Sequence, residues 1–197
     1  MTSIFDVAKY ILYAKEKITS WELQKLCYYS KAWSLALGEG AMFPEQFEAW
    51  KDGPASRSLF AERRGEFYVG KRDLYKGDRD NAPANAEDII KAVLTVYKDM
   101  NGDALRSQTY KEEPWIAARR GLPDGVSCNN EINENLMMSY YRKSDLFPIV
   151  DNLVMDYRAR RRLSSGGKEY SMSEVVGFLG ISLEDLNYVE YDDIEFD

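Results

Sequence analysis

The sequence contains no histidine. This absence excludes nucleophilic systems of the Ser-His-Asp or Cys-His type, and it excludes zinc sites that use imidazole ligands. It also removes the commonest general acid or base of enzyme catalysis. We therefore expect a protein that is not an enzyme, with no catalytic residues, no metal site and no cofactor. Catalysis by paired carboxylates remains open to this composition.

Cysteines and long apolar runs are also scarce. Cys27 and Cys128 are the only cysteines, and their spacing fits neither a metal site nor a disulfide framework, so we expect free thiols in a cytoplasmic protein. No run approaches the roughly 18 apolar residues that a membrane-spanning helix needs. The segment Met1–Asp6 has no basic or apolar stretch typical of a secretory signal. The sequence thus predicts no membrane partner.

Acidic and basic residues are distributed unevenly along the chain. Residues 171–197 contain eight acidic residues and no lysine or arginine. The formal net charge of the whole chain is −7, so residues 1–170 are close to neutral. An acidic end of this kind is typical of a solvated tail or of a contact for a basic partner.

The periodicity of apolar residues predicts a mainly α fold. We expect one multi-helix globular domain over residues 1–163, with a short β segment near residues 44–52, followed by a small helical, acidic appendage over residues 164–197. Residues 65–86 and 121–130 read as loops, and Gly53-Pro54 as a tight turn. Helices are expected near residues 4–12, 19–37, 56–64, 85–102, 114–118, 131–142 and 145–162, with a short one around Leu105.

Several helix starts carry recognisable capping signals. Thr19 followed by Glu22 predicts a capping box, and Ile18 is placed to pack on Leu23 as a hydrophobic staple. Asn85 with Asp88 three residues later predicts the start of the helix that Gly102 is expected to end, and Asp103 is expected to cap the short helix around Leu105. Glu112 or Glu113 is expected to cap the helix whose first position suits Pro114.

Three segments taken together resemble the Panacea domain, also described as the SocA-like or phage-associated protein family. The segment from Leu23 to Trp33 resembles the family pattern LQKLLYYAQGW, and Phe43 with residues 47–54 resembles F…E…EAW..GP. Residues 109–115 resemble TH.E.PW, with Tyr110 in place of the histidine. After Gly-Pro the family continues with valine and a further proline, whereas this chain reads Ala55-Ser56-Arg57.

The motif residues that carry this resemblance are expected to be structural. The three tryptophans among them are expected to fill the core, and Gly53-Pro54 to form the turn. They are Leu23, Gln24, Lys25, Leu26, Tyr28, Tyr29, Trp33, Trp50, Gly53, Pro54, Pro114 and Trp115.

The resemblance implies a bacterial antitoxin of a toxin–antitoxin system. Proteins of this family neutralise unrelated toxins by direct binding, and one relative delivers its toxin to a protease as an adaptor. The expected partners are therefore a cognate protein toxin and, as a further option, a protease such as a AAA+ unfoldase complex. The sequence leaves the oligomeric state open.

The partner contact is expected in the acidic appendage. Its apolar strip cannot be buried by a unit of about 25 residues alone, so it must dock on the body of this chain or on a partner. Apolar anchors flanked by acids suit a basic toxin. The residues proposed for this contact are Val175, Phe178, Leu179, Ile181, Leu183, Leu186, Tyr188, Tyr191 and Phe196.

Two other functions remain as alternatives. A transcriptional autoregulator is suggested by the basic run Arg158–Arg162 and by residues 174–182, which resemble the first half of a helix-turn-helix. Glu184 and Asp185 would face phosphate in its second half, so nucleic-acid binding is disfavoured. A phosphoester or nucleotide enzyme would have to use carboxylates such as Asp52, Glu112 and Glu113.

Overall fold

The computed structural model describes residues 2–62, 65–123 and 125–164. It divides into two compact units, residues 1–158 and residues 159–197, and the second is described only over residues 159–164. The structure is mainly helical, as predicted. Over the described residues, none of the helices combines the length and the apolar character needed to cross a bilayer.

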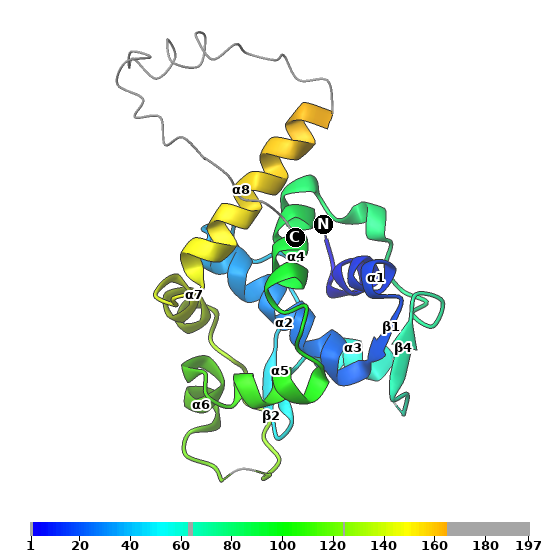
Figure 1. Cartoon of the computed structure of the whole chain (residues 1–197). Coiled ribbons are helices and arrows are strands. Elements are labelled where there is room, and N and C mark those ends of the chain that lie inside the picture. The colour runs from blue at the N-terminus through cyan, green and yellow to red at the C-terminus, as the bar shows by residue number, and fades with distance from the viewer. Residues whose placement is uncertain (1, 63–64, 124, 165–197) are drawn as a thin grey trace, which may run out of the picture. The chain divides into compact units, whose positions relative to one another are not determined.

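The helices and strands follow one another as Figure 1 shows. The helices are α1 (Ile4–Lys15), α2 (Ser20–Ala36), α3 (Arg57–Glu62), α4 (Ala84–Val96), α5 (Gly102–Thr109), α6 (Glu113–Arg119), α7 (Glu134–Arg142) and α8 (Phe147–Ser164). The strands are β1 (Lys17–Thr19), β2 (Glu48–Trp50), β3 (Gly53–Ala55) and β4 (Tyr68–Gly70), and η1 (Arg79–Asn81) is a single 3-10 turn.

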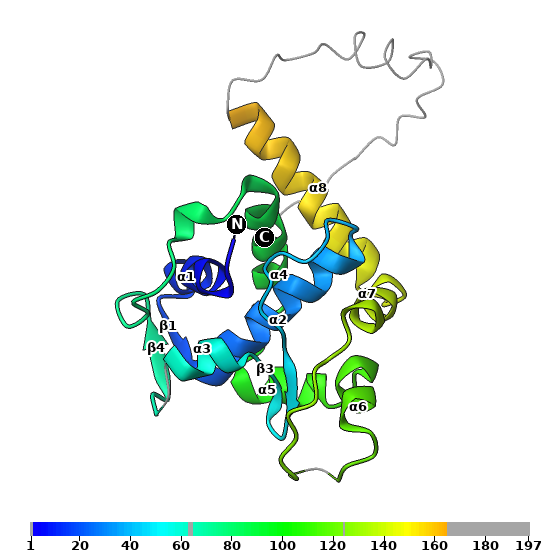
Figure 2. The ribbon, with the colours of Figure 1, turned by 180° about the vertical axis from the view of Figure 1, so that it is seen from behind.

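Helix α2 runs through the middle of residues 1–158, with α1, α4, α5 and α7 packed around it (Figures 1 and 2). Every residue from Glu22 to Ala36 is buried. A helix buried on all sides normally carries apolar residues on all sides. Here several positions are polar instead, and each buried polar group has to find a partner inside the protein.

The polar side chains of α2 tie the helix to the segments around it. Lys31 pairs with Glu134 at the start of α7 and donates to the carbonyl of Glu45 at 2.8 Å. The hydroxyl of Ser34 donates to the carbonyl of Gly40 at 2.8 Å, and that of Ser30 to Leu26 within the helix. These bonds offset the desolvation of the polar groups, so α2 can serve as the centre of the core.

The start of α2 confirms part of the capping prediction. Thr19 is the N-cap, and its hydroxyl accepts the backbone N–H of Glu22 at 3.1 Å. The carboxylate of Glu22 instead forms an ion pair with Lys15 at 3.1 Å, so it joins α1 to α2. Ile18 is buried and lies in β1, which pairs with β4 in antiparallel register. The predicted loop at residues 65–86 was therefore wrong over β4.

The helix expected between Asn85 and Gly102 has different ends. Helix α4 begins after Pro83 and ends at Val96, and Asn85 lies inside it, with its side chain bonded to Glu39 at 3.2 Å. Gly102 opens α5, whose N-cap is Asn101 and not Asp103. The side chain of Asn101 accepts the N–H of Ala104 at 2.9 Å.

The β segment predicted near residues 44–52 is confirmed as the first strand of a hairpin. Strands β2 and β3 pair in antiparallel register, with Trp50 opposite Gly53 and Glu48 opposite Ala55. The turn is therefore at Lys51-Asp52, and Gly53-Pro54 forms the second strand rather than the predicted turn. On the other edge of β2, Ala49 donates to the carbonyl of Asn130 at 2.8 Å.

Candidate functional site

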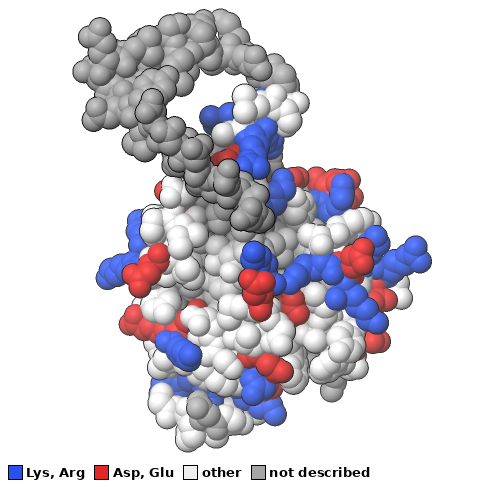
Figure 3. Space-filling view, viewed as in Figure 1, with Lys and Arg blue, Asp and Glu red and all other residues white. Residues whose placement is uncertain are grey.

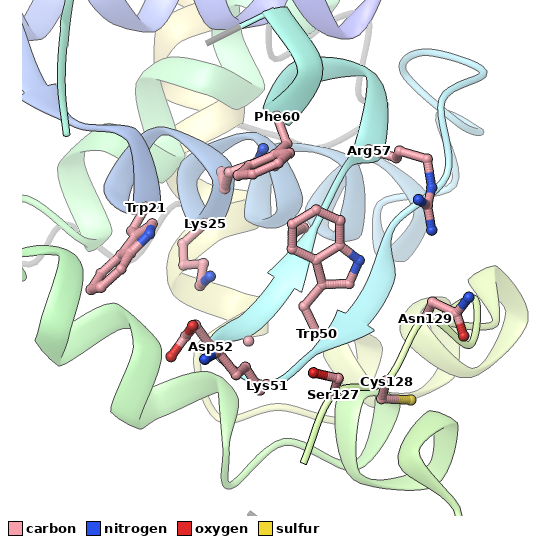
Figure 4. Close-up of a pocket in the computed structure, with 13 residues that line it drawn as sticks. Trp21, Lys25, Trp50, Lys51, Asp52, Arg57, Phe60, Ser127, Cys128 and Asn129 are labelled. Atoms are coloured by element: carbon pink, nitrogen blue, oxygen red, sulfur yellow. The ribbon is translucent and has the colours of Figure 1, made fainter. Parts of the chain in front are cut away.

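A cavity with a volume of about 620 Å³ lies beside this hairpin. It is bounded by the first turns of α2, by β2 and β3, by α3 and by residues 127–129 (Figure 4). Its lining residues are Trp21, Gln24, Lys25, Trp50, Lys51, Asp52, Gly53, Ala55, Arg57, Phe60, Ser127, Cys128 and Asn129.

Lys25 is the most deeply placed charged group of this cavity. The residue is only 2% exposed, and Figure 4 shows its side chain between Trp21 and Trp50. Its amine donates to the carbonyl of Pro54 at 3.2 Å. Burial lowers the pKa of Lys25 to about 7, since the charged form loses its hydration. Asp52 opposes this change and Arg106 adds to it.

Gln24 fixes the chain just beyond the hairpin. Its side-chain oxygen accepts the backbone N–H of Ser56 at 2.8 Å, and its nitrogen donates to the carbonyl of the same residue at 3.2 Å. The side-chain amide of Gln24 therefore pairs with both backbone polar groups of Ser56, as a neighbouring β-strand would. Gln24 and Lys25 together anchor β3 and the residue after it to α2, and they set the floor of the cavity.

Gly53 is required at its position for two reasons. Its backbone φ angle is +93°, a value that residues with a side chain rarely adopt. A Cβ atom there would lie 2.8 Å from both Lys25 Cε and Thr109 Oγ1. Strand β3 can approach α2 and α5 only because no side chain intervenes.

We expect Gly53→Ala to lower the free energy of unfolding by about 2 kcal/mol or more, because backbone strain and steric overlap add. Gly40→Ala is the matched control. Gly40 also has positive φ, but no atom lies within 4 Å of its Cβ position. This variant should therefore be destabilised only by backbone strain, by about 1 kcal/mol. Urea unfolding measures both, and equal losses would contradict the close packing at Gly53.

The third motif segment supports the hairpin from the other side. The indole N–H of Trp115 donates to the carbonyl of Trp50 at 3.0 Å. Tyr110 stacks on Trp115 with ring centroids 4.6 Å apart, and its hydroxyl donates to the carbonyl of Lys51 at 2.5 Å. Tyr110, which stands in place of the family's histidine, therefore has a structural contact with the turn.

The charged groups around the cavity are partly neutralised. Arg57 donates two hydrogen bonds to Glu48, both at 2.9 Å. Asp52 lies 3.5 Å from Arg106 of α5. Within the described part of the chain, neither Lys25 nor Lys51 forms an ion pair. On the face of the molecule in Figure 3, positive and negative side chains are intermixed.

Three exposed aromatic residues, which we call the aromatic rim, lie beside the cavity. Trp21 is 40% exposed, Phe60 is 41% exposed and Phe67 is 57% exposed. Trp21 and Phe67 meet edge to face with centroids 5.9 Å apart, and Phe60 meets Trp50 in the same way at 4.9 Å. The same three rings line a smaller hollow next to the cavity. Exposed apolar groups that adjoin one another in this way are typical of contact surfaces.

Glu112 lies in a buried cluster of tyrosines and does not line the cavity. It is the N-cap residue of α6, and Glu113 lies in the first turn, which confirms the predicted acidic helix start, but the side chain of Glu112 makes no cap bond. Its carboxylate accepts the hydroxyls of Tyr141 at 2.7 Å and Tyr29 at 3.1 Å. Burial raises the pKa of Glu112 to about 7, although these bonds and one from Gln108 oppose the change.

The three carboxylates considered for catalysis do not share a surface. Asp52 lines the cavity, Glu112 is buried, and Glu113 lines a separate shallow hollow near α7. Among the described residues, no group of three or more Cys, Asp or Glu side chains could hold a metal ion. Arg158 of the basic run pairs with Glu39 at 2.8 Å.

The structure divides the motif residues between the cavity and the core. Gln24, Lys25, Trp50 and Gly53 line the cavity, and Pro54 supplies the carbonyl that binds Lys25. Pro114 lies in the first turn of α6. The remaining residues are buried in the core: Leu23, Leu26, Tyr28, Tyr29, Trp33 and Trp115.

The residues expected to contact a partner lie outside the described part of the chain. They are Val175, Phe178, Leu179, Ile181, Leu183, Leu186, Tyr188, Tyr191 and Phe196. Sequence reasoning did not single out Trp21, Phe60 or Phe67. A tryptophan in the first turn of a helix that is otherwise buried was the one local signal available for Trp21.

Comparison with models of known protein families finds a related family. The family model described as antitoxin SocA-like, Panacea domain, matches residues 23–116. This match confirms the resemblance drawn from the three motif segments, and it spans α2 from Leu23 onward and the whole hairpin. No curated protein and no solved structure matches the chain.

Proposed function

Because residues 23–116 match the SocA-like antitoxin family, we propose that this chain neutralises a cognate protein toxin by binding it directly. The proposal places the protein in the bacterial cytoplasm, where such a toxin acts. The observation that carries it is the family match. The absence of histidine agrees with it, since inhibition by binding needs complementary surfaces and no reacting groups.

The aromatic rim is our candidate for the toxin contact. Aromatic residues are enriched among the positions that dominate binding energies, since they bury a large area with little loss of side-chain freedom. Trp21 and Phe60 stand at the mouth of a cavity, so a partner side chain could insert between them. The surrounding charged residues would then form the polar border of the interface.

The acidic appendage is a second candidate contact. Its acidic residues would speed encounter with a basic toxin, and its apolar residues would slow release. Double substitution of Phe178 and Leu179 by aspartate tests this segment. If the appendage provides the main contact, this variant loses the toxin while a variant of the aromatic rim retains it.

Delivery of the bound toxin to a protease, such as a AAA+ unfoldase complex, is a finer proposal that follows from the same family. It predicts that the toxin is degraded faster when this chain is present. A toxin whose half-life does not change in the presence of the chain would leave inhibition by binding as the whole mechanism.

Co-expression with the product of an adjacent gene tests the function itself. The adjacent gene product is expected to arrest growth when expressed alone, and co-expression of this chain should restore growth. The two proteins should also purify together. An adjacent gene product that neither arrests growth nor binds this chain would contradict the proposal.

A further inference from the structure

The cavity contains two lysines, Lys25 and Lys51, that the proposed toxin contact does not use. We propose that it is a binding site for a small, flat organic anion, with the ring of the ligand among Trp21, Trp50 and Phe60 and its negative group at the amines of Lys25 and Lys51. This inference does not rest on the antitoxin function, because it is argued from the size of the cavity and from Lys25 and Lys51, although Trp21 and Phe60 of the aromatic rim also line the cavity.

The size and the walls of the cavity define the body of the ligand. A volume of about 620 Å³ falls within the range typical of sites for small molecules. Trp50 and Phe60 form one wall and Trp21 faces them across Lys25 (Figure 4). Aromatic walls favour a flat, apolar ring, because stacked and edge-to-face contacts add to the burial of apolar area.

The charges define the second part of the ligand. Arg57 is bound by Glu48 and Asp52 lies beside Arg106, so these four groups largely compensate one another. The amines of Lys25 and Lys51 remain as an excess of positive charge at the cavity. A protonated lysine has three donors, and within the described residues the Lys25 amine donates one hydrogen bond, to the carbonyl of Pro54. A carboxylate or a similar anion would satisfy the donors that remain.

Protonation of Lys25 should be coupled to binding. The charged groups that act on its amine are Asp52 from the hairpin and Arg106 from α5, and Lys51 lines the same cavity. A bound anion stabilises the charged amine and raises its pKa above the value of about 7 in the empty cavity. An anionic ligand should therefore bind more weakly as the pH rises through this value, whereas a neutral ligand of the same shape should not.

A series of three compounds with one ring tests the site on the full-length protein. The compounds are 2-naphthoate, 2-naphthamide and 2-naphthylmethylamine, and calorimetric titration gives each dissociation constant. We expect naphthoate to bind most tightly and the amine most weakly, with at least about a tenfold difference between the two. Naphthoate should lose about tenfold in affinity between pH 6 and pH 8.5, in contrast to naphthamide.

Variants then assign the effect to named side chains. Lys25→Met keeps the length of the side chain and should reduce the preference for naphthoate over naphthamide about tenfold. Lys51→Met should reduce the same preference, and it tests the site even if Lys25→Met fails to fold. Lys98→Met, an exposed change outside the cavity, is the control and should have no effect.

Equal affinities for the three compounds would overturn the proposal. So would a preference for naphthoate that survives both cavity substitutions, because the ligand would then be bound elsewhere. Failure of this test leaves neutralisation of a toxin untouched, and failure of neutralisation with intact naphthoate binding would leave the anion site untouched.

Discussion

Replacing Glu112 by alanine is expected to lower the free energy of unfolding by about 2–5 kcal/mol, measured by urea unfolding at about pH 5.5. The carboxyl group accepts the buried hydroxyls of Tyr29 and Tyr141 and the amide of Gln108. Alanine would leave these donors without their acceptor and would open a small cavity between α2, α6 and α7. A loss below about 0.5 kcal/mol, within the range of surface substitutions, would contradict this assignment.

Glu112→Gln is the matched control, because it keeps the shape and one acceptor oxygen. Because glutamine does not titrate, the difference in stability between the two proteins at each pH reports the titration of Glu112. The folded pKa of about 7 lies above the ordinary value of 4.5, so the contribution of this group is fully present below pH 4.5 and is lost as the pH rises through 7. Between pH 4.5 and pH 7, the free energy of unfolding of the unsubstituted protein should fall by up to about 3 kcal/mol relative to that of the glutamine variant. A constant difference between the two proteins would contradict the raised pKa.

The double substitution Trp21→Glu with Phe60→Glu is expected to weaken binding of the cognate toxin by at least about 100-fold. Both rings are partly exposed beside the cavity, and carboxylates in their place would have to be desolvated in the interface. Calorimetric titration of the purified proteins gives the affinity. Because neither ring is fully buried, the fold should tolerate the change, and the unfolding temperature checks this.

Tyr75→Glu is the control for this experiment. Tyr75 is 83% exposed and lines neither the cavity nor the neighbouring hollow. The Tyr75→Glu substitution likewise replaces an aromatic ring by a carboxylate, and the toxin should bind to this variant with unchanged affinity. If the control and the double variant both bind normally, the aromatic rim is not the contact surface.

Local sequence signals were sufficient to place several elements. The strong periodicity of residues 4–12 and the cap at Thr19 predict helices α1 and α2 correctly, because both signals act over a few residues. The β segment before Lys51 is likewise indicated by nearby residues, because glycine and proline follow it in the sequence. The missed elements depend on distant partners. Strand β1 has three residues and exists because Ile18 lies opposite Val69, far along the chain.

The errors at glycines and acids have the same physical origin. Gly102 was expected to end a helix but begins α5, where a Cβ would lie 2.8 Å from Thr19 Oγ1. Glycine is needed at position 102 because of this contact with a residue distant in the sequence. Glu112 has the sequence context of a cap, yet the tyrosines of α2 and α7 take its carboxylate. The cavity likewise unites α2, the hairpin, α3 and residues 127–129, and no local pattern could indicate that union.

The central claim is that this chain acts by occupying a surface of its partner. The most direct test is to titrate the purified toxin with the purified chain and follow the activity of the toxin. The claim predicts that inhibition becomes complete only near a stoichiometric amount of the chain, and that the toxin separated from the complex has an unchanged mass and regains activity. Complete inactivation by a small fraction of that amount, with a lasting chemical change in the toxin, would show turnover and would contradict the claim.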